Sequence, residues 1–331
     1  MNSRKTKRKL RQLKQTIYIV CEGTNTEPIY FEAIGQQSDV SEKYGITVYP
    51  RKEDKDNAST KGGESIKTDA VNLVEIAQRE REKKNYDEVW AVFDKDGYTK
   101  HKEAFLYAKK HGVNLAFSSI AFEHWILLHY EQNRTAFPKS QNVIDYLEQA
   151  GYFTGYSKKA HISIYPRLQN LTQIAIENAA WLRMEMAKDL AAYDNKIYEL
   201  NPYTTVDELV MKLLGFNLPY GYIKETLTIS DISITVNDVQ RHCGITLSVS
   251  IFNHRNISYL VNKLCDNFYL KDEDQNTFPL VIDNPIIIEP SSTQEIALKF
   301  EISSATGKLR LYVSPHQKEI LIIALDKITE Q

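Results

Sequence analysis

The sequence predicts an α/β protein: a parallel-sheet domain with a helical extension, followed by a small antiparallel β-sandwich of the immunoglobulin-like kind. Three observations carry this prediction. Residues 16–130 alternate short apolar strands with helices, which is typical of a doubly wound parallel sheet. Residues 141–215 have a helical pattern throughout. After about residue 224, short alternating runs are separated by Asn, Asp, Pro or Gly, as in a β-sandwich.

The length and composition favour two domains and a reduced, cytoplasmic setting. The chain has 331 residues, of which 42% are hydrophobic and 25% charged, enough for two apolar cores. We expect a basic tail over residues 1–15, an α/β domain over 16–220 and an accessory β-domain over 225–331, with the boundary near 219–224. No run approaches the ~18 apolar residues of a membrane helix, and no secretory leader is recognisable. The three cysteines form no CxxC pair, which argues against disulfides and a cysteine zinc site.

The N-terminal tail is strongly basic. Residues 1–14 hold seven Lys or Arg and no acidic residue, so the tail could contact phosphates. A frayed, solvated terminus explains the same composition and is the simpler interpretation. The net charge of −2 argues against strong nonspecific duplex binding by the chain alone.

The elements of the α/β domain follow from apolar patterns and from helix-ending residues. The pattern around Gly112 predicts the end of one helix there, and a capping sequence at 204–208 predicts the start of a last helix that ends at Gly215. Residues 51–67 are polar and read as a surface loop. The expected strands are 16–21, 46–49, 88–93 and 114–118; the expected helices are 27–34, 68–84, 99–111, 122–130 and a long pattern over 162–194; the expected β-domain strands are 226–236, 244–253, 258–269, 278–289, 293–302 and 308–313.

Acidic residues follow three of the predicted strands. Glu22 and Glu27 come after the first strand, Asp94 and Asp96 after strand 88–93, and Glu123 opens the helix after the fourth strand. In open α/β sheets, ligands bind beyond the carboxyl ends of the strands. Several anions at one edge repel each other unless a cation neutralises them, and Mg²⁺ or Mn²⁺ prefers oxygen ligands. The pattern therefore indicates a divalent-metal site suited to phosphoryl chemistry.

Each acidic residue also has a simpler explanation. A DxD sequence after a strand is most often a turn, and Glu22, Glu27 and Glu123 could serve the positive ends of nearby helices. His124 and His129 are more often packing residues than ligands. The combination is more specific than any single residue.

Four separated motifs together resemble one known family. They are IVCEGTNTEPIYF at 19–31, VFDKD at 92–96, FEHWILLH at 122–129 and NPYTTV at 201–206, and they look like the motifs of the RloB-like family. The resemblance covers roughly residues 14–216, with the motifs in the family's order. It implies a Toprim-type fold, as in topoisomerases, primases and the OLD-family and PARIS-type nucleases. It also implies a role in restriction or phage-defence loci, often beside an ATPase partner.

The resemblance assigns roles residue by residue. Glu22 matches the Toprim glutamate after the first strand, as general acid/base or metal ligand. Asp94 and Asp96 match the aspartate pair that holds Mg²⁺. Glu27 and Glu123 match further family acids: Glu27 is assigned to the metal and Glu123 to the catalytic set.

His124 is a candidate phosphate contact. The sequence departs from the family pattern at 119–121 (Ser-Ile-Ala), so the approach to the Phe-Glu motif differs. The resemblance ends before residue 225 and says nothing of the β-domain.

The leading functional hypothesis is a Mg²⁺- or Mn²⁺-dependent endonuclease that hydrolyses phosphodiester bonds in DNA or RNA, tRNA included. The expected partners are nucleic acid and an ATPase, a homodimer is compatible with the sequence, and no membrane contact is expected. A second enzyme hypothesis is a haloacid-dehalogenase phosphatase with Asp94 as nucleophile and Asp96 as acid. An inserted tyrosine spoils that motif, and it occurs late in the sheet. The non-enzymatic alternative is a Toprim-like sensor or regulatory subunit of a defence ATPase complex.

Overall fold

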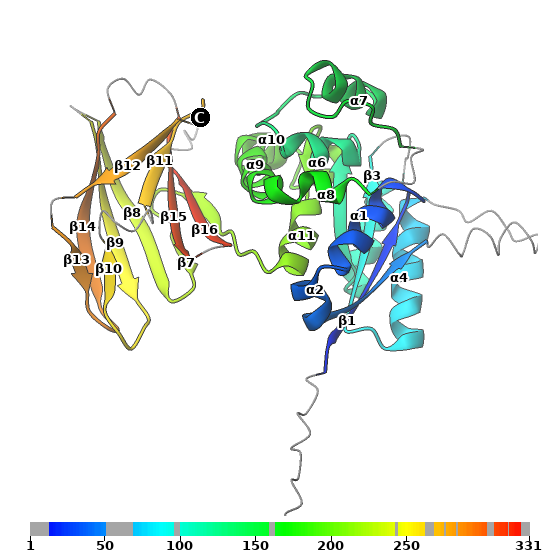
Figure 1. Cartoon of the computed structure of the whole chain (residues 1–331), viewed down its shortest axis with the longest axis horizontal. Coiled ribbons are helices and arrows are strands. Elements are labelled where there is room, and N and C mark those ends of the chain that lie inside the picture. The colour runs from blue at the N-terminus through cyan, green and yellow to red at the C-terminus, as the bar shows by residue number, and fades with distance from the viewer. Residues whose placement is uncertain are drawn as a thin grey trace, which may run out of the picture. The chain divides into compact units, whose positions relative to one another are not determined.

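The chain divides into two compact units, Met1–Leu214 and Gly215–Gln331 (Figure 1). The structure is a computed structural model of the whole chain. The sequence placed the boundary slightly later, near 219–224. Gly215 lies at the division and follows the last helix of the first unit with a positive φ of 72°. The structure describes residues 13–50, 69–95, 100–158, 163–241, 244–261, 268–274, 276–282, 284–302, 308–316 and 318–325.

The first unit is built on a five-stranded sheet in the order β2-β1-β3-β4-β5. The first four strands are parallel, as the alternating pattern predicts. β5 pairs antiparallel with β4 and corrects the expectation that 141–215 is all helical. Two residues are too short to produce an alternating pattern, so β5 has no sequence signal. The strands are β1 (Gln15–Cys21), β2 (Tyr44–Tyr49), β3 (Glu88–Asp94), β4 (Asn114–Ser119) and β5 (Tyr203–Thr204).

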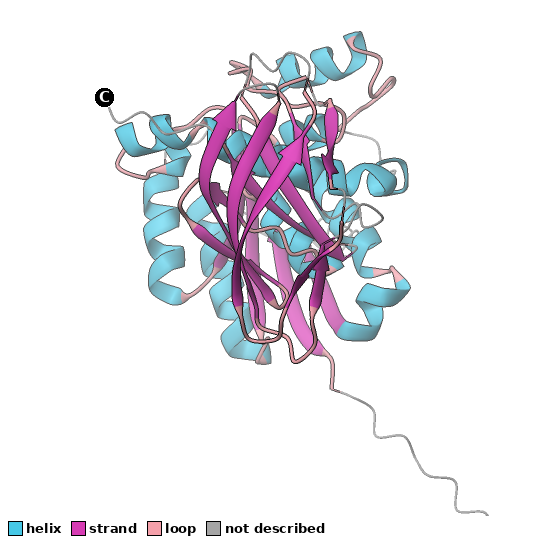
Figure 2. Cartoon of the chain, turned by 90° about the vertical axis from the view of Figure 1, so that its left-hand side faces the viewer, coloured by secondary structure: helices cyan, strands magenta, loops and turns pink. Residues whose placement is uncertain are grey.

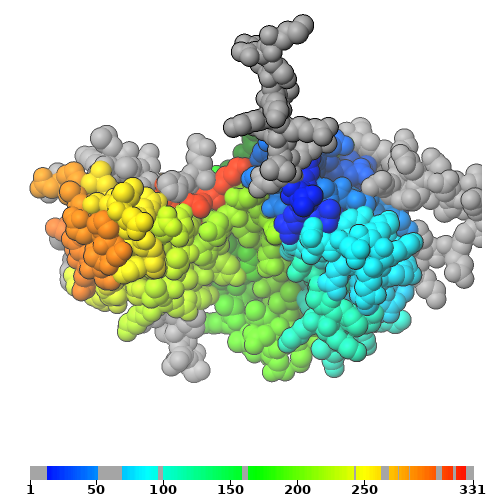
Figure 3. Space-filling model, turned by 90° about the horizontal axis from the view of Figure 1, so that it is seen from below, coloured from blue at the N-terminus to red at the C-terminus, as the bar shows by residue number. Residues whose placement is uncertain are grey.

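Helices cover both faces of this sheet (Figure 1). α4 (Ala70–Lys84) and α5 (His101–His111) pack on one face, where their small and aliphatic side chains meet alternate strand residues such as Tyr18 and Val20. Figure 3 shows α4 in cyan beside the blue N-terminal strand. The other face carries α1 (Thr26–Gly35), α2 (Ser38–Lys43) and α11 (Val206–Leu214).

The ends of α4 and α5 follow from individual residues. Asp69 Oδ1 accepts a hydrogen bond from Asn72 N at 3.1 Å and caps the start of α4. Asn85 ends α4 in a left-handed conformation. Gly112 ends α5 with a φ of 63°, which confirms the end predicted there.

The helical extension consists of short helices. It comprises α7 (Ser140–Gln149), α8 (Tyr165–Leu168), α9 (Thr172–Glu185) and α10 (Ala187–Ala192), besides α6 (Phe122–Leu128) at the edge of the sheet. The prediction of one continuous helical pattern within 162–194 is therefore wrong. A tight 3₁₀ turn at Gln169–Leu171 and a non-helical Met186 divide it, although the apolar periodicity runs across both interruptions. A further 3₁₀ turn lies at Ile197–Glu199.

The second unit is a layered, mostly antiparallel β-structure (Figure 2). β12 joins its layers, because its first residues pair with β11 and its last with β14. Alternate residues such as Leu247, Val249 and Ile251 form the buried core. The strands are β6 (Tyr220–Tyr222), β7 (Thr226–Ile229), β8 (Ile232–Arg241), β9 (Ile245–Asn253), β10 (Tyr259–Val261), β11 (Phe268–Lys271), β12 (Thr277–Val281), β13 (Ile286–Ile288), β14 (Thr293–Phe300), β15 (Arg310–His316) and β16 (Glu319–Ala324).

Three predicted strands of this unit are each two strands. The run 226–236 is a hairpin of β7 and the start of β8, with Ser230 at a positive φ of 50° in the turn. The runs 258–269 and 278–289 likewise divide into β10 with β11 and β12 with β13. Alternation continues across these breaks, so periodicity alone did not locate them.

No helix in the described part of the chain is long and apolar enough to cross a membrane. Cys21 is a free, buried thiol, and Cys243 and Cys265 lie outside the described residues.

Candidate functional site

The candidate site lies where β1 and β3 end, side by side in the middle of the sheet. Their parallel register aligns Cys21 with Val92. Glu22 N donates to Val92 O at 2.9 Å, which carries the β1–β3 pairing one residue past Cys21. Asp94 N in turn donates to Glu22 Oε2 at 3.0 Å. The structure therefore brings the carboxylate of Glu22 to the end of β3, next to Asp94.

Glu27 joins this edge from the first turn of α1. Its carboxylate lies over the backbone of Gly23, where a Cβ atom would collide with it. Burial, followed by the negative charge of Glu123, raises the pKa of Glu27 from 4.5 to about 7. Glu22 adds a smaller repulsion.

The same neighbouring charges affect the pKa of Asp94. Its pKa is raised well above the usual value by burial first, and then by the charges of Glu27 and Glu123. These shifts identify Glu22, Glu27, Asp94 and Glu123 as one electrostatic group, which we call the acidic cluster. Because these four carboxylates repel each other, binding of a cation among them would be favourable.

Glu123 is the buried member of the acidic cluster and has two partners. It sits in the first turn of α6, and its side chain is only 1% exposed. Tyr156 OH donates to Oε1 at 2.5 Å, and Lys158 Nζ lies 2.8 Å from Oε2. For Lys158, burial lowers the pKa, but the charges and hydrogen bond of its acidic neighbours outweigh burial and raise it overall.

Tyr156 and Lys158 are not among the site residues that the sequence predicts. They lie between α7 and α8, in a stretch without periodicity or a motif, and more than 30 residues from Glu123. A lysine in a polar loop gives no signal of its own that it reaches a buried glutamate.

α6 is held against α1 by aromatic contacts. Trp125 Nε1 donates to Tyr30 OH at 3.1 Å, and the Tyr30 and Phe122 rings meet edge to face, with their centroids 5.5 Å apart. These contacts fix the helix that carries Glu123 relative to the helix that carries Glu27.

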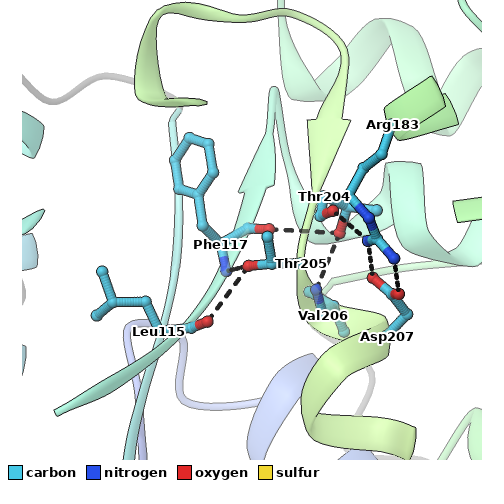
Figure 4. A network of polar contacts seen from close by, with 7 residues as sticks. All are labelled: Leu115, Phe117, Arg183, Thr204, Thr205, Val206 and Asp207. Atoms are coloured by element: carbon cyan, nitrogen blue, oxygen red, sulfur yellow. Dashed lines mark hydrogen bonds and ion pairs between the residues drawn. The ribbon is translucent and has the colours of Figure 1, made fainter. Parts of the chain in front are cut away.

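A buried polar network joins α9 and α11 to β4 (Figure 4). Arg183 on α9 donates to both carboxylate oxygens of Asp207 on α11, at 2.7 and 2.6 Å, and to Thr204 O at 3.1 Å. Thr205 Oγ1 accepts from Phe117 N at 3.0 Å, so the segment that contains β5 is fastened to β4. The NPYTTV motif thus has a structural task here: it ties α9 and α11 to the strand that leads to α6.

The other predicted residues have different outcomes. Asp96 lies outside the described residues. His124 is completely buried, with its ring centroid 6.4 Å from that of Phe137, and burial lowers its pKa to about 4. Its ring therefore does not reach the surface in this conformation, and its contact with a phosphate stays a prediction. His129 is buried in the same way.

The acidic cluster suits a divalent ion by its chemistry and is partly neutralised by a lysine of the chain itself. All four members offer carboxylate oxygens, the ligands of Mg²⁺ and Mn²⁺. Within the described residues, however, no three Asp, Glu, His or Cys side chains are arranged to hold a metal ion, and the ammonium group of Lys158 lies against Glu123.

A cavity of about 380 Å³ lies elsewhere, between α4 and strands β1 and β2. Tyr18, Tyr49 and Arg79 are among its lining residues, and no member of the acidic cluster is.

The fold and site define an α/β protein with acidic residues at its strand ends and an appended β-rich unit. The model of the RloB-like protein family matches residues 17–213, which is more than half of the chain and includes the whole acidic cluster. The chain therefore belongs to the RloB-like family, as its motifs indicated. No curated protein matches it.

Several solved structures share distant similarity with the chain. The yjhA protein of Bacillus subtilis is 16% identical and covers 32% of this chain and 99% of its own, with a TM-score of 0.28. An uncharacterized beta-sandwich protein of Clostridium difficile is 12% identical, covering 34% and 96%, with a TM-score of 0.25. A two-domain protein of Bacteroides vulgatus, containing a predicted PHP-like metal-dependent phosphoesterase, is 11% identical, covering 76% and 90%, with a TM-score of 0.17. Scores this low carry no argument about function.

Proposed function

We propose that the chain is a Mg²⁺- or Mn²⁺-dependent nuclease of the Toprim type that hydrolyses phosphodiester bonds in DNA or RNA, with tRNA as one candidate substrate. A single observation carries the proposal. Glu22 accepts a hydrogen bond from the backbone of Asp94 at the carboxyl edge of a parallel sheet, and Glu27 and Glu123 complete a mutually repelling group there. A structural role alone would not favour four acidic side chains in one partly buried place.

The residues have distinct tasks in this proposal. Glu22, Glu27 and Asp94 provide oxygen ligands, and we place Asp96 with them from the family pattern. When bound, a divalent ion supplies positive charge that stabilises the developing charge on the phosphate and the leaving oxygen. Glu22 Oε2 accepts a hydrogen bond from the Asp94 amide, which holds the carboxylate at the end of β3. Glu123 is held by Tyr156 and Lys158 and contributes to the cluster as its buried member.

The proposed biological setting rests on the resemblance of the motifs to those of the RloB-like family. We propose that the protein acts in antiphage defence with an ATPase partner, in the cytoplasm. No member of the acidic cluster comes from the second unit. In this proposal the second unit serves recognition or assembly. The basic N-terminal tail and the lysines of residues 51–67 are candidate contacts for nucleic acid.

A direct cleavage assay tests the proposal. The full chain is incubated with plasmid, single-stranded DNA and total tRNA, in Mg²⁺ or Mn²⁺, with and without the ATPase from the same locus. Glu22→Gln and Asp94→Ala should each abolish cleavage while the thermal unfolding of the protein stays cooperative. Glu75→Gln on the exposed surface of α4 is the control and should cleave normally. Full activity in both site variants would eliminate this mechanism.

A second candidate function is a non-catalytic sensor or regulatory subunit of a defence ATPase complex. The ion pair of Lys158 with Glu123 favours it, because the acidic cluster is already partly neutralised by the chain itself. Absence of metal binding together with retained binding of the ATPase would select this function over hydrolysis.

A further inference from the structure

The segment that carries Tyr156 and Lys158 is attached to the acidic cluster at several points. Asn25 Nδ2, just before α1, donates to Lys158 O at 3.2 Å. Thr26 Oγ1 lies 3.3 Å from Tyr156 OH, which in turn donates to Glu123. Both elements that supply Glu27 and Glu123 therefore hold this segment in place.

The two partners of the ion pair differ in their freedom to move. The Glu123 side chain is 1% exposed, whereas that of Lys158 is 41% exposed. Glu123 cannot follow a departing partner into solvent. Lys158 can leave, because its long side chain already reaches water and only its head group contacts the glutamate.

We propose that Lys158 is a tethered counter-ion that competes with a divalent metal ion for Glu123 and its neighbours. This inference rests on the proposed function, since it concerns the same acidic cluster. Without metal, Lys158 neutralises the buried glutamate and closes the site. With metal, the carboxylate exchanges one cation for another, and the lysine head group is released toward solvent.

The competition follows from charge and space. The ammonium group lies within direct contact distance of Glu123 Oε2, so a metal ion that approaches this oxygen meets a positive charge already in place. A fixed positive charge this near opposes a second cation strongly, because the surroundings are partly desolvated.

A purely structural ion pair makes a different prediction. Its removal would lower stability but leave metal affinity unchanged or weaker. A competing counter-ion predicts that its removal lowers stability only when metal is absent, and that it tightens metal binding.

Calorimetric titration of the full chain with Mn²⁺ alone distinguishes the two. Lys158→Gln keeps a hydrogen-bond donor for Glu123 and removes the charge, so its Mn²⁺ dissociation constant should fall at least about tenfold. Lys158→Arg keeps the charge and should bind Mn²⁺ as the natural chain does. Lys139→Met removes the same charge from the exposed residue before α7 and should change nothing. Lys158→Met is the second neutral variant if the glutamine variant does not fold.

Thermal unfolding supplies a readout that needs no metal-dependent activity. The melting temperature of Lys158→Gln should fall in EDTA and return toward that of the natural chain in saturating Mn²⁺. Equal Mn²⁺ affinity in the natural chain and Lys158→Gln overturns the inference and leaves the proposed function standing. Failure of both proteins to bind Mn²⁺ overturns the inference and the proposed function together.

Discussion

Replacement of Glu27 by Gln should stabilise the metal-free protein at alkaline pH. Glu27 ionises in the unfolded chain near 4.5, but in the folded chain its pKa is about 7, because of burial and then the charge of Glu123. That difference corresponds to roughly 3 kcal/mol at pH values above 7. Solvent screening around a partly exposed side chain reduces it, so we expect a gain of about 1–3 kcal/mol for the amide.

The pH range of this gain follows from the sign of the shift. Between about pH 4.5 and 7, the folded chain holds a proton on Glu27 that the unfolded chain has lost, so its contribution to stability falls as pH rises. Below 4.5 both states are protonated, and the substitution should gain little. His124 and His129 act in the opposite direction, because a folded pKa of about 4 makes stability fall as pH drops from 6.5. The histidines contribute equally to both proteins, so their effect cancels in the difference in unfolding free energy between the variant and the natural chain at each pH.

Urea unfolding in EDTA at pH 5, 6, 7 and 8 measures this difference. The three tryptophans, Trp90, Trp125 and Trp181, all lie in the first unit, so their fluorescence reports its unfolding separately. Glu75→Gln makes the same chemical change on an exposed part of α4 and should be neutral at every pH. A gain for Glu27→Gln that is as large at pH 5 as at pH 8, or a loss at pH 8, would refute the reasoning.

Two further predictions concern the supports of the site. Gly23→Ala should weaken Mn²⁺ binding while changing the free energy of unfolding by less than about 1 kcal/mol, because the new Cβ meets only the flexible end of Glu27; an unchanged titration would contradict this. Asp207→Ala should lower the free energy of unfolding of the first unit by about 3–5 kcal/mol, because it leaves the buried Arg183 without its ion pair. Combining it with Arg183→Met should recover most of the loss, and a cost below about 1 kcal/mol in tryptophan-monitored urea unfolding would show that the pair is not a support.

The sequence predicted the central sheet because its strands are buried on both faces. Runs such as 89–93 are apolar throughout, and local residues such as Gly112 mark where helices end. The predicted ends of helices and strands were wrong where the apolar periodicity continued through a bend in the chain. The division of 162–194 and the hairpin within 226–236 depend on backbone conformation at Met186 and Ser230, which apolar spacing does not encode.

The meeting of Glu22 and Asp94 was predictable because strand order and direction decide it. Once two parallel strands are neighbours, residues just past their ends must lie close together. The position of His124 was not predictable, since every residue of the short helix α6 is buried and no polar face distinguishes its neighbours. Sequence can place a residue on α6 but cannot show that the surrounding extension covers all sides of the helix.

Burial of Glu123 connects the fold to the chemistry of the site. An ionised side chain that is 1% exposed needs a positive or hydrogen-bonding partner, because an unpaired buried charge costs about 3–5 kcal/mol. Lys158 and Tyr156 meet that need in the metal-free chain. When Lys158 turns away, Glu123 needs another cation or a proton to neutralise it. Burial of the glutamate thus couples release of the Lys158 head group to occupation of the acidic cluster by a cation.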